Sequence, residues 1–283
     1  MKKKTVSMFM GLVLGVTTVF SSIGPAVVTV SAAESGVTDS DCTDKSTKEP
    51  ESDKVVPDAN QYKYQKDELA AFCHFGPNTF NEIEWGEHYG DKKPSEIFRL
   101  NQKFDAETMV STLKSAGFKK LIITAKHHDG FCIWPSEYTD YDAEAAGYKG
   151  DILEEISTAC TKHGMDMGLY LSPWDIHEPS YGYYDKNGKP TTKENDYLDY
   201  NEYYNNQLKE ILGNGKYGNN GHFVEVRMDG AKGSGANAQE YDFNTWFKTI
   251  QNYEGKEVAG NSADCMLFGA QAYTTVRWIG NED

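Results

Sequence analysis

Short apolar runs alternate with segments of helical periodicity through most of the chain, and this alternation constrains the fold more than any other feature. The apolar runs, which we expect to be strands, fall at residues 70–76, 120–124, 167–171, 223–228, 266–268 and 276–279. The segments with helical spacing between them cover residues 104–117, 151–163, 196–212 and 243–253. Such alternation, with near-continuously apolar strands, is typical of a parallel sheet covered on both faces. The sequence therefore predicts an α/β fold.

Polar and aromatic side chains of the kinds used in binding and catalysis gather just beyond the ends of the predicted strands. They are His74, His127, His128, Asp129, Trp174, Asp175 and Asp229. In a parallel (β/α)8 barrel the carboxyl ends of all strands meet at one mouth, whereas a doubly wound sheet concentrates its ligands at one switch point. Because four successive strands contribute such residues, we predict a TIM-type (β/α)8 barrel, with a doubly wound sheet as the alternative.

The N-terminal residues 1–33 have the features of a secretory signal peptide. Three lysines at 2–4 precede an apolar run at 8–20, and small residues offer a cleavage site after Ala32 or Ala33. A transmembrane anchor is the alternative, but polar and helix-breaking residues interrupt the segment and no positive cluster follows it. We therefore expect cleavage and secretion, with no stable membrane insertion of the remaining chain.

The charge and the cysteines exclude several classes of protein. The formal net charge is −15 and no basic stripe is present, which disfavours nucleic acid as a partner, because Lys and Arg must neutralise its phosphates. Residues 34–58 are rich in small polar and charged residues and predict a flexible acidic linker. The folded domain is expected at 59–283, with its packed part beginning near Tyr62. The five cysteines include no CxxC pair, which predicts free thiols rather than a disulfide framework or a structural zinc site.

The run His127-His128-Asp129 contains metal-ligating residue types, and Asp229 or His74 could complete a ligand set. However, adjacent residues of an extended segment point to opposite faces, so we expect only one of the two histidines to face the mouth. We favour one histidine in the site, with the other hydrogen-bonded behind it, over a metal centre.

Asp229 ends an apolar run and precedes Gly230, a placement suited to presenting a carboxylate to a cavity. Capping the next helix is the alternative role for this residue, although Ser234 or Asp242 could serve there.

Four tryptophans also fall near the predicted strand ends, at Trp85, Trp134, Trp174 and Trp278. Aromatic faces stack on the C–H surface of a sugar, while carboxylates and histidines bind its hydroxyls and perform acid–base chemistry. The combination indicates a sugar site, with core packing as the alternative for each tryptophan.

Several strings of residues together resemble one known family. They are His-Phe-Gly at 74–76, Asn-Thr-Phe at 78–80, Glu-Trp-Gly at 84–86, Ala-Lys-His-His-Asp-Gly-Phe at 125–131 and Gly-Leu-Tyr-Leu-Ser-Pro-Trp-Asp at 168–175. Their order and spacing are similar to glycoside hydrolase family 29, the retaining α-L-fucosidases, from about residue 62 to residue 283.

The resemblance implies a role for each matching residue. Asp229, in Glu-Val-Arg-Met-Asp-Gly-Ala at 225–231, would be the nucleophile, with Arg227 standing where the family usually has an aromatic residue. Glu282, in Arg-Trp-Ile-Gly-Asn-Glu at 277–282, would be the general acid/base, as in the subgroup that acts on α-1,3 and α-1,4 fucosyl branches. The substrate-binding positions would be His74, Glu84, Trp85, His127, His128, Tyr170, Trp174, Arg277 and Trp278. No metal and no cofactor is implied.

The resemblance also implies a secreted exo-α-L-fucosidase that acts on fucosylated oligosaccharides or glycoconjugates. Five or six predicted strands are fewer than the eight of a closed barrel. We therefore expect a partial barrel, truncated at its C-terminus, with weak activity and with any cell-surface attachment provided by further domains. A non-catalytic fucose-binding remnant and a metal-dependent hydrolase remain as alternative functions.

Overall fold

The computed structural model describes residues 56–278 except 88, 236–237, 255–263 and 270–273. The predicted signal peptide, most of the predicted linker, Cys42 and Glu282 lie outside the described residues, and the domain boundaries at 33 and 58 remain predictions.

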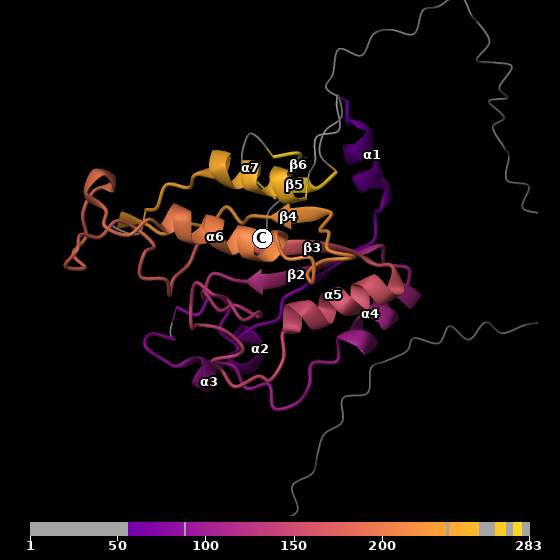
Figure 1. The fold of residues 1–283 in the computed structure, drawn as a ribbon, viewed down its shortest axis with the longest axis horizontal. Coiled ribbons are helices and arrows are strands. Elements are labelled where there is room, and N and C mark those ends of the chain that lie inside the picture. Colours follow the sequence, from indigo (N-terminus) through magenta and orange to yellow (C-terminus); the bar gives the residue numbers. More distant parts are fainter. Residues whose placement is uncertain (1–55, 88, 236–237, 255–263, 270–273, 279–283) are drawn as a thin grey trace, which may run out of the picture. The chain divides into compact units, whose positions relative to one another are not determined.

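Six parallel strands form the sheet of the described part, and they are hydrogen-bonded in the order in which they occur in the chain (Figure 1). The strands are β1 (Ala70–Cys73), β2 (Lys120–Lys126), β3 (Asp166–Leu171), β4 (Glu225–Arg227), β5 (Met266–Gly269) and β6 (Val276–Arg277). Strictly sequential order belongs to a (β/α) barrel, because a doubly wound sheet reverses direction at its switch point. The barrel prediction is therefore confirmed, with six of the eight strands of a closed barrel.

The two faces of the sheet have different chemistry. On one face, alternate residues of β2 and β3, such as Leu121, Ile123 and Leu169, are completely buried in the main hydrophobic core with the helices. On the other face the strand registers align Tyr170 with Arg227. The predicted near-continuous apolar character therefore fails for β4, whose Glu225 and Arg227 flank a buried Val226.

Among the described residues, four long helices lie between consecutive strands, and each has an aspartate as its N-terminal cap. They are α4 (Ala106–Ser115), α5 (Ile152–His163), α6 (Tyr200–Leu212) and α7 (Phe243–Tyr253). The side chains of Asp105, Asp151, Asp199 and Asp242 accept the backbone N–H of the third helical residue in each case. In Figure 1, α4 lies against α5 and α6 lies against α7.

The predicted start of the third long helix was wrong by four residues. Residue 196 is the expected first residue, but Lys193–Asn195 form a short 3-10 helix, η1, and α6 begins only after its cap, Asp199. The cap of α7 is Asp242, so Asp229 is not needed as a helix cap.

Three helices on the N-terminal side were not predicted from the sequence. They are α1 (Ala59–Lys66), α2 (Asn78–Asn81) and α3 (Pro94–Ile97). Helix α1 buries none of its residues, so its sequence needs no apolar periodicity and shows none. Its start is instead marked by a capping box between Asp58 and Gln61. The other two helices span a single turn, which is too short to give a periodic signal.

The four described cysteines, Cys73, Cys132, Cys160 and Cys265, are free thiols, as predicted, and all but Cys73 are buried. Among the helices of the described part, none combines the length and the apolar character needed to cross a bilayer.

Candidate functional site

A pocket of about 690 Å³ lies at the carboxyl ends of the strands, and its wall includes residues that lie in, or directly after, each of the six strands. Its lining residues are Phe72, His74, Glu84, Trp85, His127, His128, Tyr170, Arg227, Asp229, Gly230, Ala231, Phe268 and Trp278. The structure thus brings together most of the residues that the sequence singled out.

Both histidines that follow β2 line the pocket, which corrects the prediction that only one would face it. The prediction assumed that the strand continues through them, but β2 ends at Lys126 after an irregularity in its register. Beyond the strand the backbone turns, so the alternation of faces no longer applies. The ring centroids of His127 and His128 are 4.3 Å apart, and His74 lies 5.4 Å from His127.

These histidines are held in a dry environment that disfavours their charged form. Burial lowers the pKa of His127 to about 3, with a further contribution from His128 and His74. Burial also lowers the pKa of His128, although the nearby carboxylates of Asp229 and Glu84 oppose the effect. At neutral pH the two rings are therefore neutral, and each offers one donor and one acceptor nitrogen.

Asp229 presents a carboxylate of fixed orientation to the pocket. The hydroxyl of Tyr170 donates to Oδ2 at 2.9 Å, and the backbone N–H of Ala231 donates to Oδ1 at 2.8 Å. The imidazole Nε2 of His128 lies 4.0 Å from the same Oδ2, and the side chain of Asp229 is 18% exposed. A carboxylate that is held on both oxygens and still reaches the pocket is suited to attack an electrophilic carbon or to bind a cation.

Arg227 lines the pocket two residues before Asp229. Its positive charge interacts with neighbouring side chains. Its guanidinium forms an ion pair with Glu225 and lies 3.8 Å from the ring centroid of Phe268. Glu225, which is completely buried, also pairs with the ammonium of Lys120 at 3.0 Å. The arginine that departs from the family pattern is therefore 20% exposed at the pocket and is paired with the buried Glu225, which also pairs with Lys120.

The tryptophans divide between the site and the core. Trp85 is 44% exposed and lines the pocket together with Trp278, whereas Trp134 is completely buried. Trp174 does not line this pocket: it lies 5.0 Å from the ring of His128 and borders the neighbouring groove. Trp134 is thus a core residue, as the alternative interpretation allowed.

Two predicted substrate-binding residues occupy outer positions. Glu84 lines the pocket but is exposed, and Arg277 is exposed and absent from the lining. Four further lining residues, Phe72, Gly230, Ala231 and Phe268, were not predicted as site residues, and Arg227 was named only as a departure from the family pattern. Phe72 precedes His74 by two residues, and the period of two along a strand is the signal that could have placed both on one face.

A groove of about 860 Å³ adjoins the pocket and shares Trp85 with it. Besides Trp85 and Trp174, its wall contains the aromatic residues Tyr181, Tyr184 and Tyr197. A ligand that extends out of the pocket past Trp85 would therefore meet further aromatic faces.

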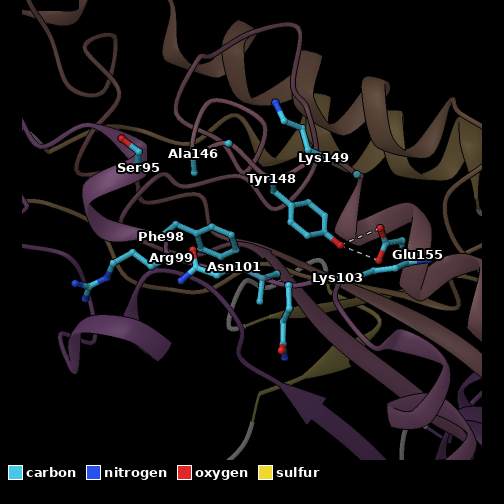
Figure 2. A pocket seen from close by; sticks show the side chains of 13 residues that line it. Ser95, Phe98, Arg99, Asn101, Lys103, Ala146, Tyr148, Lys149 and Glu155 are labelled. Atoms are coloured by element: carbon cyan, nitrogen blue, oxygen red, sulfur yellow. Dashed lines mark hydrogen bonds between the residues drawn. The ribbon is translucent and has the colours of Figure 1, made fainter.

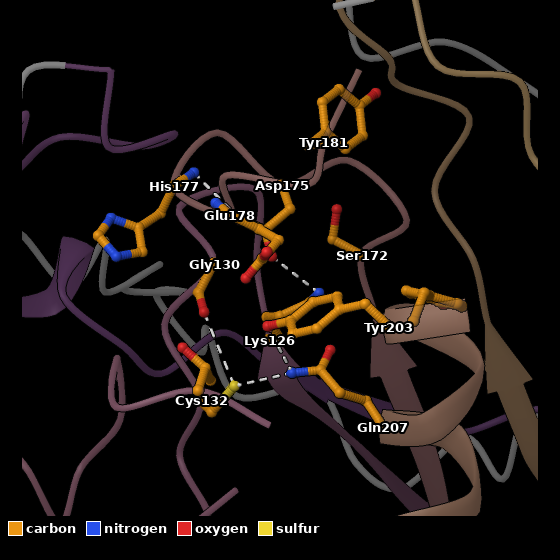
Figure 3. A network of polar contacts seen from close by, with 12 residues as sticks. Lys126, Gly130, Cys132, Ser172, Asp175, His177, Glu178, Tyr181, Tyr203 and Gln207 are labelled. Carbon is orange, nitrogen blue, oxygen red and sulfur yellow. Dashed lines mark hydrogen bonds and ion pairs between the residues drawn. The ribbon is translucent and has the colours of Figure 1, made fainter. Parts of the chain in front are cut away.

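A buried ion pair holds together the two loops that carry the histidines and Trp174 (Figure 3). The ammonium of Lys126 contacts Asp175 Oδ2 at 3.0 Å, and the two side chains are 0% and 1% exposed. The other oxygen of Asp175 accepts the backbone N–H groups of His177 and Glu178. Asp129 lies behind the pocket in this region, and burial raises its pKa to about 7.

A cavity of similar volume, about 670 Å³, lies between residues 98–103 and 146–150 (Figure 2). None of the predicted site residues lines it, and its carboxylate, Glu155, accepts hydrogen bonds from the hydroxyl of Tyr148 at 2.9 and 3.0 Å. The cavity at the strand ends therefore remains the candidate site.

Within the described ranges, no three His, Cys, Asp or Glu side chains are grouped so that they could hold a metal ion. The set of His127, His128 and Asp229 that the sequence allowed is thus not assembled as a ligand cluster.

A fixed carboxylate beside aromatic faces, at the mouth of a (β/α) barrel, is the arrangement of barrel-type glycoside hydrolases. Fold and pocket together define this class.

Comparison with known proteins then identifies the family. The alpha-L-fucosidase family model matches residues 37–275. Alpha-L-fucosidase 1 of Arabidopsis thaliana is 41% identical over 230 residues, which cover 80% of this chain and 39% of the plant protein. A solved Ruminococcus gnavus GH29 fucosidase in complex with fucose is 75% identical, with a TM-score of 0.78 over 83% of this chain and 48% of that one. The crystal structure of SpGH29 is 46% identical, with a TM-score of 0.67 over 80% of this chain and 46% of that one.

The chain therefore belongs to the alpha-L-fucosidase family, glycoside hydrolase family 29. It spans less than half the length of these relatives.

Proposed function

We propose that the pocket binds a terminal α-L-fucosyl residue and that the protein hydrolyses its glycosidic bond with retention of configuration. The observation that carries this proposal is the carboxylate of Asp229, which Tyr170 and the Ala231 N–H hold in place beside three histidines. Membership of the family and the fucose complex of the Ruminococcus gnavus relative support it.

In the first step Asp229 attacks the anomeric carbon, and the bond from that carbon to the leaving oxygen breaks. Glu282 donates the proton that the leaving oxygen needs, which yields a covalent glycosyl-enzyme. In the second step Glu282 takes a proton from water, and the oxygen of that water displaces Asp229. This double displacement requires the two carboxyl groups to lie ~5–5.5 Å apart. The role of Glu282 rests on the Arg-Trp-Ile-Gly-Asn-Glu string at 277–282, since this residue lies outside the described part.

Substrate binding follows from the chemistry of the pocket walls. The rings of His74, His127 and His128 hold sugar hydroxyls, and Trp85 packs against the apolar edge that carries the C6 methyl group. The remainder of a fucosylated glycan would extend into the aromatic groove that begins at Trp85. By its 277–282 string, the protein would belong to the subgroup acting on α-1,3 and α-1,4 fucosyl branches.

We also propose that residues 1–33 direct the protein out of the cell and are then removed. N-terminal sequencing of the protein recovered from the culture medium tests this, and a mature chain that begins at Glu34 or Ala33 is the expected result. A chain that keeps residues 1–33 and stays with the cells would contradict it.

Turnover of an aryl α-L-fucoside tests the proposed activity. We expect weak turnover from these 283 residues, and Asp229→Asn should reduce it by at least about 10³-fold through loss of the nucleophile. Asp105→Asn is the matched control, because asparagine caps a helix as well as aspartate does. Equal activity of the Asp229 variant and the control would contradict the proposal.

The alternative functions are outcomes of the same experiments. Binding of L-fucose in a calorimeter without any turnover would indicate a non-catalytic sugar-binding protein. Loss of turnover in the presence of a chelator, restored by added metal, would indicate a metal-dependent hydrolase.

A further inference from the structure

We propose that Ser172 is a positioning residue that holds His128 in a single tautomer, so that Nε2 accepts a hydrogen bond from a sugar hydroxyl. This inference rests on the proposed function of the pocket, but the position of the proton on His128 can be measured without any ligand.

The position of one hydrogen atom decides the tautomer. Ser172 Oγ lies 2.7 Å from the carbonyl oxygen of Trp174 and 2.6 Å from His128 Nδ1. A carbonyl oxygen can only accept, so the single hydroxyl hydrogen of Ser172 must be donated to Trp174. Ser172 Oγ can then only accept from the ring, and Nδ1 of His128 must carry a hydrogen. In the neutral ring this leaves Nε2 without one.

The surroundings prevent the serine and the histidine from rearranging. Ser172 is completely buried. Its backbone N–H donates to the carbonyl oxygen of Lys126 at 2.9 Å, and the N–H of Ile176 donates to the carbonyl oxygen of His128 at 2.8 Å. The residues on both sides of the Ser172–His128 contact are therefore tied together by backbone hydrogen bonds.

The tautomer of His128 determines which ligand groups the pocket favours beside Nε2. Nε2 of His128 lies 4.0 Å from Asp229 Oδ2, and that oxygen already accepts the hydroxyl of Tyr170. Two acceptors therefore face each other across a gap in which a ligand oxygen can lie ~2.8 Å from Nε2. Only a ligand group that donates a hydrogen satisfies Nε2, which favours a free hydroxyl over an ether or a carbonyl at this position. Ser172 thus contributes to specificity without touching the sugar.

Nitrogen-15 NMR of the histidine side chains tests the tautomer directly in the wild-type chain at neutral pH. The His128 signals are identified by their disappearance in His128→Gln. We expect a protonated Nδ1 and an unprotonated Nε2 for His128. A protonated Nε2 with an unprotonated Nδ1 would overturn the inference, whether or not the chain binds fucose.

The energetic consequence is tested with Ser172→Ala and with Ser157→Ala as a matched control. Ser157 is also completely buried, donates to a backbone carbonyl (Leu153, 2.7 Å) and accepts one hydrogen bond (from the N–H of Gly218, 2.8 Å), but it does not line the pocket. In a calorimeter, Ser172→Ala should weaken L-fucose binding by about 2- to 10-fold, the worth of one hydrogen bond. Ser157→Ala should leave L-fucose binding unchanged.

A double-mutant cycle separates positioning from a general structural role. If Ser172 acts through His128, then Ser172→Ala should cause no further loss of L-fucose affinity in a His128→Ala background. The same loss in both backgrounds would overturn the inference. Absence of L-fucose binding by the wild-type chain would instead contradict the proposed function, and the NMR measurement would still decide the tautomer.

Discussion

Lys126→Met should destabilise the protein strongly, because it leaves the carboxylate of Asp175 buried without its counter-charge. The two side chains are 0% and 1% exposed, and their charged atoms are 3.0 Å apart (Figure 3). Water cannot replace the lysine at such a site, and removing one partner of a buried ion pair costs about 3–5 kcal/mol of unfolding free energy. The affected loops carry His128 and Trp174, so the same change should also weaken binding in the pocket.

The assay is urea unfolding followed by tryptophan fluorescence, with Lys162→Met as the matched control. Lys162 pairs with Glu107 at 2.7 Å, but the two side chains are 63% and 51% exposed. Water screens such a pair, so its loss should leave the unfolding midpoint close to that of the wild type. A midpoint for Lys126→Met as high as that of the control would refute the reasoning.

A second variant shows whether the cost comes from the uncompensated charge. Asp175→Asn removes the charge but keeps an oxygen that can accept the backbone N–H groups of His177 and Glu178. Combined with Lys126→Met, it should therefore recover part of the lost stability. Further destabilisation in the double variant would show that charge burial is not the cause.

Two further changes affect the backbone and the pH dependence of stability. Gly130→Ala should destabilise the fold more than Gly117→Ala. Both glycines have positive φ (+77° and +91°), but only at residue 130 would an added Cβ overlap a neighbouring atom, Asp175 Oδ1. Equal urea unfolding midpoints for the two variants would contradict this prediction. The hydrogen bond that His222 Nδ1 donates to Glu254, together with the negative charge of Glu254, raises the pKa of His222. The stability gained from the charged form of His222 is therefore complete below the unfolded pKa of about 6.5. That stability is lost as the pH rises through the raised folded value. The difference in unfolding free energy between the wild type and His222→Asn should therefore shrink between pH 6 and pH 9. A difference that stays constant over this range would contradict a stabilising charge on His222.

Local signals in the sequence are sufficient to predict the barrel and most of the pocket. The positions of the strands follow from apolar runs, and the caps at Asp105, Asp151 and Asp242 mark where helices begin. Since parallel strands bring their carboxyl ends together, residues that are far apart in the chain, such as His74 and Asp229, can be assigned to one site from the strand pattern alone.

The remaining features depend on tertiary contacts that no local pattern encodes. The orientation of His127 and His128 depends on where β2 ends, and a register irregularity sets that point. Trp174 borders the groove rather than the pocket because the loop after β3 turns around Asp175. Ser172 lies in the 168–175 string that carries the family resemblance, but no local pattern predicts its role, because that role lies in two hydrogen bonds made by one buried oxygen.

The most direct test of the central claim is to trap the covalent intermediate on the proposed nucleophile. A 2-deoxy-2-fluoro-α-L-fucosyl substrate with a good leaving group slows the breakdown of the glycosyl-enzyme, and peptide mass spectrometry then locates the label. We predict a single fluorofucosyl group on Asp229, and no label in Asp229→Asn. Hydrolysis of α-L-fucosides by a chain that carries no label, or a label on another carboxylate, would contradict the assignment.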